Sequence, residues 1–330
     1  MTPPFVSIAV PCLNEERYVE ACLAALRAQD YPAERLEILV ADGGSTDRTR
    51  EILQTIVRED PRVRVVDNPG RIQAAGLNEA IRRARGDVVI RADVHADYAP
   101  DYVRRCVEVL DETGAWNVGG AARPRAKGPF QAAVCAALKS PLSFGGSKYR
   151  DERNEGWVES VFPGAFRREV FEEVGLFDPK AITNEDAEIN QRIWAHGGRV
   201  WLSPKIVVHY YPRDSFGGLA RQYFKYGVGR ARTLLKHGRF LSVRPAVPFL
   251  ALTGELVLAI AAPPVAAIAA SAYALVTLVE AVRVAHGEGF RAVPVVWAIF
   301  PVLHVSHAIG FASGLVRYAL SPDWPRAAPA

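Results

Sequence analysis

Residues 5–91 alternate between short apolar runs and helical patterns, and this alternation restricts the chain to few folds. Apolar runs typical of buried strands lie at 5–11, 36–41, 63–66 and 87–91. The segments between them, such as 15–29 and 74–84, place apolar residues at helical spacing. Strands separated by helices of about a dozen residues form parallel sheets through right-handed crossovers. The sequence therefore predicts an α/β fold with a mostly parallel sheet flanked by helices.

Polar residues follow these predicted strands, at the edge where an open parallel sheet binds its ligands. They are Asn14 and Glu15 after the first strand, Asp42 at the second, Asn68 after the third, and Asp93 with His95 after the fourth. Loops that are distant along the chain are thus expected to build one binding edge.

Asp42 ends the second strand within A-D-G-G-S-T-D. A carboxylate at this place can accept hydrogen bonds from a nucleobase or a ribose, and the glycines allow a close approach of the backbone. The same letters also suit a tight turn in which Ser45 or Thr46 caps the next helix. By itself the motif supports both interpretations equally.

The segment R-A-D-V-H-A-D at 91–97 presents Asp93, His95 and Asp97 at alternating positions. Carboxylate oxygens suit Mg²⁺ or Mn²⁺, and Mn²⁺ tolerates imidazole. A metal there would neutralise a diphosphate leaving group. The alternative is a solvated acidic turn in which Asp97 caps a helix starting near Pro100. The position directly after a buried strand favours the metal interpretation most for Asp93.

Asn184, Glu185 and Asp186 stand at the start of a predicted helix. Adjacent carboxylates destabilise one another, although a helix N-terminus partly offsets this. An acid pair held in a pocket can supply a general base. The alternative is a simple cap, for which Asn184 or Thr183 would suffice.

Charge is distributed unevenly, although the whole chain carries a formal charge of only +4. Residues 213–244 contain eight Lys or Arg and one acid, whereas 245–282 contain two charged residues. Within the basic stretch, R-Q-Y-F-K-Y-G-V-G-R-A-R at 221–232 mixes bases with aromatic residues. We expect it both to contact phosphates or an acceptor and to lie against a membrane surface. The composition as a whole excludes a disordered or collagen-like chain.

Three apolar runs follow the basic stretch, at 245–262, 265–282 and, more weakly, 292–312. Each is about as long as the roughly 20 residues that a spanning helix needs. Buried core helices are the alternative, but the scarcity of charge favours a membrane. Pro263-Pro264 is either the turn of a hairpin or a kink in one helix. With no apparent signal peptide and a basic stretch before the first run, residues 1–244 are expected on the cytoplasmic side.

Taken together, the motifs resemble family 2 glycosyltransferases of the GT-A fold, which has a Rossmann-like, mixed but mostly parallel sheet. The likeness runs from Val6 to about Arg232. Four segments carry it: V-S-I-A-V-P-C-L-N-E-E, L-E-I-L-V-A-D-G-G-S-T-D-R-T, R-I-Q-A-A-G-L-N-E-A-I-R-R-A-R-G-D-V-V-I-R-A-D and N-E-D-A-E-I-N-Q-R. In this order and spacing the set is far more specific than any single member.

The resemblance implies an inverting glycosyltransferase that moves one sugar from a nucleotide diphosphate sugar, with UDP-hexose expected, in cell-surface or exopolysaccharide synthesis. Nucleotide-binding residues implied by the matching motifs are Pro11, Asn14, Glu15, Asp42, Asn68 and Asp93. Asp93 would hold Mn²⁺ or Mg²⁺, either with His95 as the second ligand or with the diphosphate and water. Asp186 would act as catalytic base and Glu185 would orient the acceptor. Residues expected at the acceptor or its phosphate are Gly164, Ala165, Gln222, Lys225, Arg230 and Arg232.

Two departures from the family pattern refine this expectation. The usual D-x-D metal motif reads D-V-H, and the Q-x-x-R-W motif of processive synthases appears only as Q-Y-F-K-Y at 222–226. Because the hydrophobic tail is also small, the sequence argues against a synthase that extrudes a polymer and for the transfer of a single sugar.

The domain organisation expected is a GT-A catalytic domain at 1–240 and a membrane-associated helical region at 241–330, at the cytoplasmic face of the cell membrane. Expected partners are a nucleotide-sugar donor, a saccharide or polyprenyl-linked acceptor and membrane lipid, but no nucleic acid.

One alternative function is that of a nucleotidyltransferase, although P-C-L-N-E-E lacks the glycine-rich basic loop that such enzymes use. Another is a non-catalytic membrane-bound sugar-nucleotide sensor, against which the intact N-E-D motif argues.

Overall fold

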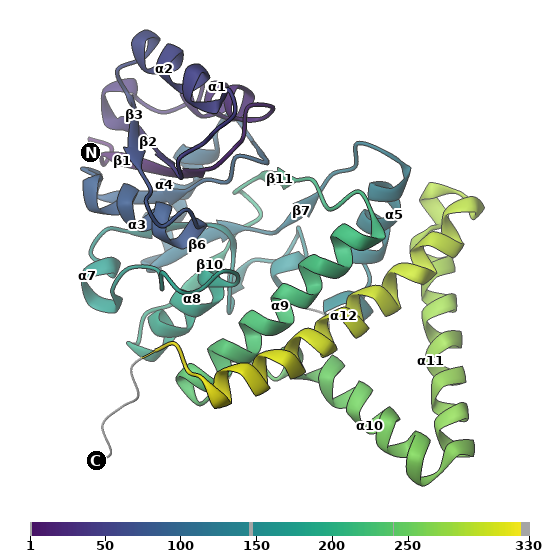
Figure 1. Ribbon diagram of the computed structural model, residues 1–330. Helices are drawn as coiled ribbons and strands as arrows, with labels where there is room; N and C mark the ends of the chain where they lie inside the picture. The colour runs from purple at the N-terminus through teal and green to yellow at the C-terminus, as the bar shows by residue number, and fades with distance from the viewer. Residues whose placement is uncertain (1, 145–147, 240, 325–330) are drawn as a thin grey trace, which may run out of the picture. The chain divides into compact units, whose positions relative to one another are not determined.

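A computed structural model describes residues 2–144, 148–239 and 241–324, and its centre is a mixed sheet of eight strands (Figure 1). The strand order is β3-β2-β1-β4-β9-β6-β10-β8. These strands are β1 (Val6–Cys12), β2 (Leu36–Asp42), β3 (Val63–Asp67), β4 (Val88–Arg91), β6 (Asn117–Gly120), β8 (Gly156–Trp157), β9 (Phe162–Arg167) and β10 (Val200–Leu202). A smaller sheet has the order β5-β11-β7, with β5 (Ala96–Tyr98), β7 (Arg123–Pro124) and β11 (Val208–Tyr210).

The half of the large sheet from β3 to β4 is wholly parallel, as the strand–helix alternation predicts. β9 then pairs antiparallel with both β4 and β6, and β10 returns to the parallel direction beside β6. The predicted α/β class with a mostly parallel sheet is therefore confirmed. The carboxyl ends of β1, β2, β3 and β4 lie along one edge, where they bring the loops after these strands together.

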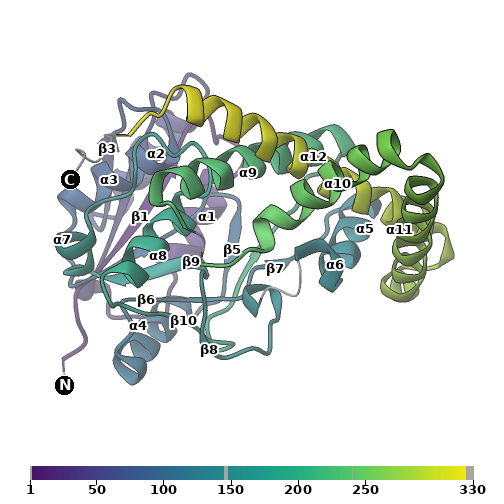
Figure 2. The same ribbon diagram turned by 90° about the horizontal axis from the view of Figure 1, so that it is seen from below.

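Helices cover both faces of this sheet, which explains why β1 and β2 are almost entirely buried. One face packs on α1 (Val19–Arg27), α2 (Thr49–Glu59) and α4 (Tyr102–Thr113). The other packs on α3 (Gln73–Arg83), α7 (Val170–Val174) and α8 (Glu185–Ala195). Figure 2 shows α3, α7 and α8 from below.

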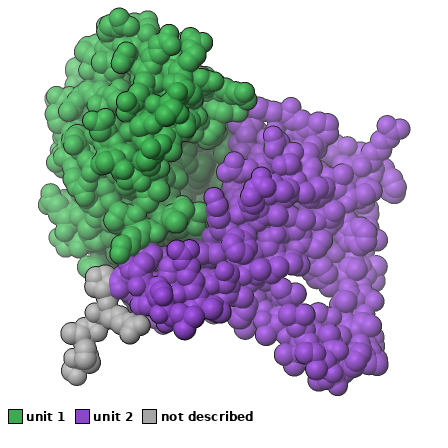
Figure 3. Space-filling model, viewed as in Figure 1, with its two compact units in different colours: residues 1–123, 148–210 green, residues 124–147, 211–330 purple. Residues whose placement is uncertain are grey.

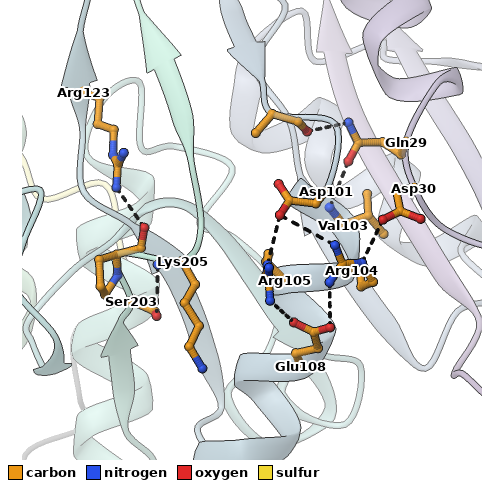
Figure 4. Close-up of polar contacts among 12 residues, drawn as sticks. Gln29, Asp30, Asp101, Val103, Arg104, Arg105, Glu108, Arg123, Ser203 and Lys205 are labelled. Carbon is orange, nitrogen blue, oxygen red and sulfur yellow. Dashed lines mark hydrogen bonds and ion pairs between the residues drawn. The ribbon is translucent and has the colours of Figure 1, made fainter.

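Polar contacts tie α4 to the segment after α1 (Figure 4). The amide of Gln29 donates to the carbonyl of Ala99 at 2.9 Å, and its oxygen accepts from the backbone N–H of Val103 at 2.9 Å. Arg104 adds an ion pair to Asp30 at 2.9 Å. These contacts fix the chain between β5 and α4, directly after the segment that carries the D-V-H motif.

The chain divides into two compact units, coloured separately in Figure 3. Unit 1 comprises 1–123 and 148–210, and therefore the whole large sheet; unit 2 comprises 124–147 and 211–330. Helices of unit 2 are α5 (Pro129–Leu138), α6 (Pro141–Phe144), α9 (Phe216–His237), α10 (Val247–Ala261), α11 (Pro263–Val284) and α12 (Val293–Leu320). The predicted catalytic domain, 1–240, thus includes α9 of unit 2, and its extent as a domain stays a prediction.

Within the part of unit 2 that the structure describes, three helical segments are long and apolar enough to cross a membrane, at 244–261, 263–284 and 290–320. The break at Ala262 separates α10 from α11, so the two prolines begin a new helix rather than kink a single one.

Within unit 2, α9 packs closely along α12. A Cβ on Gly227 of α9 would collide with the backbone of His307, and one on Gly310 of α12 would collide with the carbonyl of Phe224. Glycine at both positions lets the two backbones approach.

Glu37 in β2 has a buried carboxylate that links neighbouring segments at the amino-terminal side of the sheet. Its Oε1 accepts from the hydroxyl of Ser7 and the backbone N–H of Arg85, both at 2.7 Å, and its Oε2 accepts from the Arg85 and Arg64 side chains. Burial raises the pKa of Glu37, but the hydrogen bonds from Ser7 and Arg85 outweigh it and hold the pKa below its ordinary value.

We expect Glu37→Gln to lower the free energy of unfolding by about 2 kcal/mol at neutral pH, because it removes the charge from a buried carboxylate that accepts hydrogen bonds from Ser7, Arg64 and Arg85. Since the folded-state pKa is lowered, the contribution of the carboxylate is full above pH 4.5 and is lost as pH falls through the folded-state value. Thermal unfolding should therefore show a Tm gap between variant and wild type that narrows on acidification. Glu51→Gln, which removes an exposed carboxylate, should leave Tm nearly unchanged. A gap independent of pH would contradict this assignment.

Candidate functional site

Asp42 ends β2 at the carboxyl edge and is almost wholly buried. Its Oδ1 accepts from the hydroxyl of Ser45 at 2.5 Å, and its Oδ2 accepts from Nε of Arg50 at 2.6 Å. Burial raises the pKa of Asp42, but hydrogen bonds from Ser45 and Arg50 hold it below its ordinary value. The expectation that Ser45 or Thr46 caps the next helix is wrong, since α2 begins at Thr49 and Ser45 binds Asp42 instead.

The loop after β1 is fastened to the loop after β2. Asn14 takes a left-handed backbone conformation with φ of 56°, and its N–H donates to the Ser45 hydroxyl at 2.8 Å. Its side-chain oxygen accepts from the N–H of Thr46 at 2.8 Å. The N–H of Glu15 donates to the hydroxyl of Thr49 at 2.7 Å. Asn14, Glu15 and Asp42 are thereby brought together, as the carboxyl-edge rule predicts.

Pro11 and Asn68 also lie together, on either side of Gly76 of α3. A Cβ on Gly76 would lie 2.8 Å from the amide nitrogen of Asn68 and 3.2 Å from Cβ of Pro11. The Asn68 amide nitrogen donates to the carbonyl of Ile72 at 3.1 Å. Its Oδ1 is buried and accepts no hydrogen bond within the described part of the chain. A buried acceptor of this kind is unusual in a folded protein.

Asp93 follows β4 and is held by two side chains on the same oxygen. Oδ1 accepts from the Gln73 amide at 2.8 Å and lies 3.3 Å from Nε of Arg91. The hydroxyl of Tyr98 fixes the backbone here, accepting from the N–H of Asp93 at 2.6 Å and donating to its carbonyl at 3.0 Å. The loop after β4 is thus rigid at the residue that the sequence singles out for metal binding.

Arg91 also reaches the start of α8, where its Nη1 lies 3.0 Å from Oε1 of Glu185. Both side chains are strongly buried. The pKa of Glu185 is raised to about 7, chiefly by burial and also by nearby Asp186, against the opposing effect of Arg91. The structure therefore brings Asp93 and Glu185 to one guanidinium.

Asp186 stands in the first turn of α8 beside Glu185, but it is only partly buried. Successive residues on a helix point about 100° apart, so the first acid faces Arg91 while the second turns toward solvent. Its Oδ1 accepts from the N–H of Ala187 at 2.7 Å. Asn184 precedes the helix with φ of 61° and makes no side-chain cap hydrogen bond, so its role as a side-chain cap is not seen.

His95 is exposed and contacts the loop after β1 rather than Asp93. Its Nε2 lies 3.0 Å from Oε1 of Glu15, and its ring meets Tyr18 edge-on at 4.5 Å. Among the described residues, groups of three or more His, Cys, Asp or Glu arranged to hold a metal ion are absent. The donor set still fits Mg²⁺ or Mn²⁺ through Asp93, because such ions often take one carboxylate and complete their shell with phosphate and water.

Gly164 and Ala165 lie inside β9 and are buried. A Cβ on Gly164 would lie 2.8 Å from Oδ1 of Asn117 and 2.6 Å from the ring of Phe166. The glycine is therefore required for packing within unit 1. The lining of an acceptor pocket by these two residues stays a prediction.

The remaining predicted residues lie on α9 in unit 2. Gln222 donates to the hydroxyl of Tyr226 at 2.9 Å, and Lys225 is exposed. Arg232 is buried, pairs with Asp323 at 2.7 Å and lies beside the rings of Tyr318 and Trp324. Since this guanidinium already holds α9 to the end of α12, contact of Arg232 with a phosphate stays a prediction, as does that of Arg230.

Sequence reasoning missed Arg91, Gln73 and Tyr98, which hold Asp93 and Glu185 in place. A signal exists only for Arg91, which is the charged last residue of an otherwise apolar strand, V-V-I-R. The other two are recognisable only from contacts that the fold creates.

Comparison with known proteins gives a consistent picture. A sequence model described as glycosyl transferase family 2 matches residues 7–175. The chain is 41% identical over 243 residues to the succinoglycan biosynthesis protein ExoA of Rhizobium meliloti, covering 73% of each chain. It is 30% identical over 240 residues to a dolichyl N-acetyl-alpha-D-glucosaminyl phosphate 3-beta-D-2,3-diacetamido-2,3-dideoxy-beta-D-glucuronosyltransferase of Methanococcus voltae, covering 70% of this chain and 74% of that one.

A solved structure shares the fold. It is the mannosyltransferase PcManGT from Pyrobaculum calidifontis, in complex with GDP-Man and Mn²⁺. The TM-score is 0.64 at 22% identity, over 96% of this chain and 88% of that one. The likeness supports the GT-A arrangement of the sheet predicted from the motifs.

The raised pKa of Glu185 predicts an unusual dependence of stability on pH. Because its folded-state pKa of about 7 exceeds the ordinary 4.5, the folded chain binds more protons between these values, and its stability falls as pH rises through them. Glu185→Gln cannot titrate and should lack this loss. Scanning calorimetry of the full chain from pH 5 to 8 should show that the Tm of the variant, relative to that of wild type, increases as pH rises. Glu172→Gln, at an exposed site on α7, should show the same dependence of Tm on pH as wild type. If wild type and Glu185→Gln showed the same dependence of Tm on pH, the assignment would be contradicted.

Proposed function

The chain belongs to glycosyl transferase family 2, and from this we propose that it is an inverting enzyme that transfers a single sugar from a nucleoside diphosphate sugar to a hydroxyl acceptor. The observation that carries the proposal is the meeting of Asp93 and Glu185 at Arg91, with Asp186 beside them. It sets a candidate leaving-group site next to a candidate base at the carboxyl edge of the sheet. We further propose polysaccharide synthesis as its setting, since the relative from Rhizobium meliloti is named for succinoglycan biosynthesis.

The proposed donor site is the edge formed by the loops after β1, β2 and β3. The lowered pKa of Asp42 keeps a buried carboxylate charged and able to accept from a nucleobase or ribose. Asn68 contributes a buried acceptor oxygen, and Pro11, Asn14 and Glu15 form the adjoining wall. A UDP-hexose is the donor that we propose, on the basis of the motif resemblance.

Asp93 is the residue proposed to hold Mn²⁺ or Mg²⁺, with His95 as a second ligand if it leaves Glu15. A bound ion would supply charge neutralisation for the departing diphosphate. The chain itself contributes rigidity here, since Gln73 fixes one oxygen of Asp93 and Tyr98 fixes its backbone.

Asp186 is proposed as the general base. Its carboxylate takes the proton of the acceptor hydroxyl while that oxygen forms a bond to the anomeric carbon, and the bond from this carbon to the diphosphate oxygen breaks on the opposite face. A glycoside with inverted configuration and a nucleoside diphosphate result. Glu185 orients the acceptor, and the partial exposure of Asp186 leaves it accessible to a substrate.

The features of unit 2 support our proposals for the acceptor and for the location of the enzyme. Its three apolar helices support anchoring in a membrane, and the basic residues that precede them support the cytoplasmic face as the location that we propose. We propose a saccharide or polyprenyl-linked saccharide as acceptor. Gln222, Lys225 and Arg230 would contact it or its phosphate, and the apolar helices would contact membrane lipid.

Asp186→Asn should keep donor binding and lose about 10² to 10⁴ in transfer rate, because the amide cannot take the proton. The measurement is nucleoside diphosphate release from UDP-, GDP- and dTDP-sugars by the full chain in detergent, together with donor affinity. Asp151→Asn, at an exposed site of unit 1, is the matched control and should behave as wild type. Unchanged turnover of Asp186→Asn would remove it as base, and pyrophosphate exchange in place of diphosphate release would indicate a nucleotidyltransferase.

Removal of divalent cations should abolish transfer, and added Mn²⁺ or Mg²⁺ should restore it, because the diphosphate then departs with its charge neutralised. Asp93→Asn should raise the Mn²⁺ concentration that gives half-maximal activity, and His95→Ala should raise it less. Asp97→Asn, in the same segment, serves as the control. Full activity in the presence of a chelator would refute the metal role of Asp93.

A further inference from the structure

We propose that Arg91 is a positioning residue that sets the spacing between the donor side of the site, through Asp93, and the acceptor side, through Glu185. This inference rests on the proposed function and deepens it. Neither the family motifs nor the residues predicted from the sequence give Arg91 a role.

The geometry of Arg91 suits this task. It is the last residue of β4, and its side chain is only 10% exposed. Nε faces Oδ1 of Asp93 at 3.3 Å, and Nη1 faces Oε1 of Glu185 at 3.0 Å. Because a guanidinium is planar and rigid, two contacts through different nitrogens fix both the distance and the angle between the carboxylates.

The two elements that carry these carboxylates are also held by other contacts, so the guanidinium joins two fixed parts of the chain. Asp93 is held by Gln73 and Tyr98. The later turns of α8 are held by Asn190, which accepts from the Asn117 amide of β6 at 2.7 Å. Arg91 fastens the first turn of α8, which carries the proposed base, to the end of β4.

Loss of this contact should affect the chemical step more than donor binding. Without Arg91, Glu185 would be a buried carboxylate without its cation, and it would protonate or move toward solvent. Asp186 is the next residue on the same turn and would move with it. A displacement of about 1 Å in a reacting group can cost about 10²-fold in rate.

The test compares the full chain in detergent, by kcat and donor KM, for wild type, Arg91→Gln, Arg91→Lys, Glu185→Gln and the double variant Arg91→Gln/Glu185→Gln. Arg91→Gln should lower kcat by about 10²-fold and change donor KM by no more than about threefold. Arg91→Lys keeps the charge but cannot make both contacts, so it should lose at least about tenfold, and it preserves the test if the glutamine variant fails to fold. The double variant should lie within about threefold of the worse single variant, because both act through one contact.

The matched control is Arg192→Gln, which breaks the ion pair to Glu188 at 2.8 Å further along the same helix. It should lower Tm while leaving kcat within about threefold of wild type. Equal losses of kcat in Arg192→Gln and Arg91→Gln would reduce Arg91 to a merely structural role and overturn the inference. So would wild-type kcat in Arg91→Gln or Arg91→Lys. If wild type transfers sugar and these variants match it, only the inference fails; if wild type transfers no sugar, the proposed function fails and the inference with it.

Discussion

A buried guanidinium between two carboxylates is the contact on which the candidate site depends. Asp93, Glu185 and Asp186 gather at one edge of the sheet, where like charges repel and burial penalises them further. Arg91 offsets part of this cost by contacting two of the three. The raised pKa of Glu185 shows that the compensation is incomplete. This balance of charge supports the proposal that the donor binds here together with a divalent ion.

The parallel sheet is what brings these groups together from distant parts of the chain. Helices cover both faces of the sheet, so the strands cannot shift. The loops at the carboxyl ends of the strands are therefore held in place as well. The loop after β1 is hydrogen-bonded to the loop after β2 through Asn14 and Ser45. On the other side of the edge, α8 carries buried polar residues with partners of their own, such as Asn190 on Asn117. The site is therefore built on fixed elements rather than on a mobile loop.

The sequence predicted the parts of the site that depend on local pattern. Apolar alternation located β1 to β4, and the rule for parallel sheets then placed Asn14, Asp42 and Asp93 at one edge. The expected helix cap by Ser45 or Thr46 is wrong because α2 begins only at Thr49, and the Ser45 hydroxyl instead donates to the buried carboxylate of Asp42. Arg91 with Glu185 and Arg232 with Asp323 are pairs about 90 residues apart, set by tertiary packing that local pattern does not encode. The close packing of α9 on α12 at Gly227 and Gly310 is likewise a consequence of the fold.

The proposed chemistry makes one stereochemical demand, which is the most direct test of the central claim. With one base at Asp186 and a leaving group at Asp93, the acceptor must attack from the face opposite the diphosphate in a single displacement. The anomeric configuration of the purified product can be read from its proton NMR coupling constant. For an α-linked donor sugar the account predicts a β-linked product; an α-linked product would contradict it.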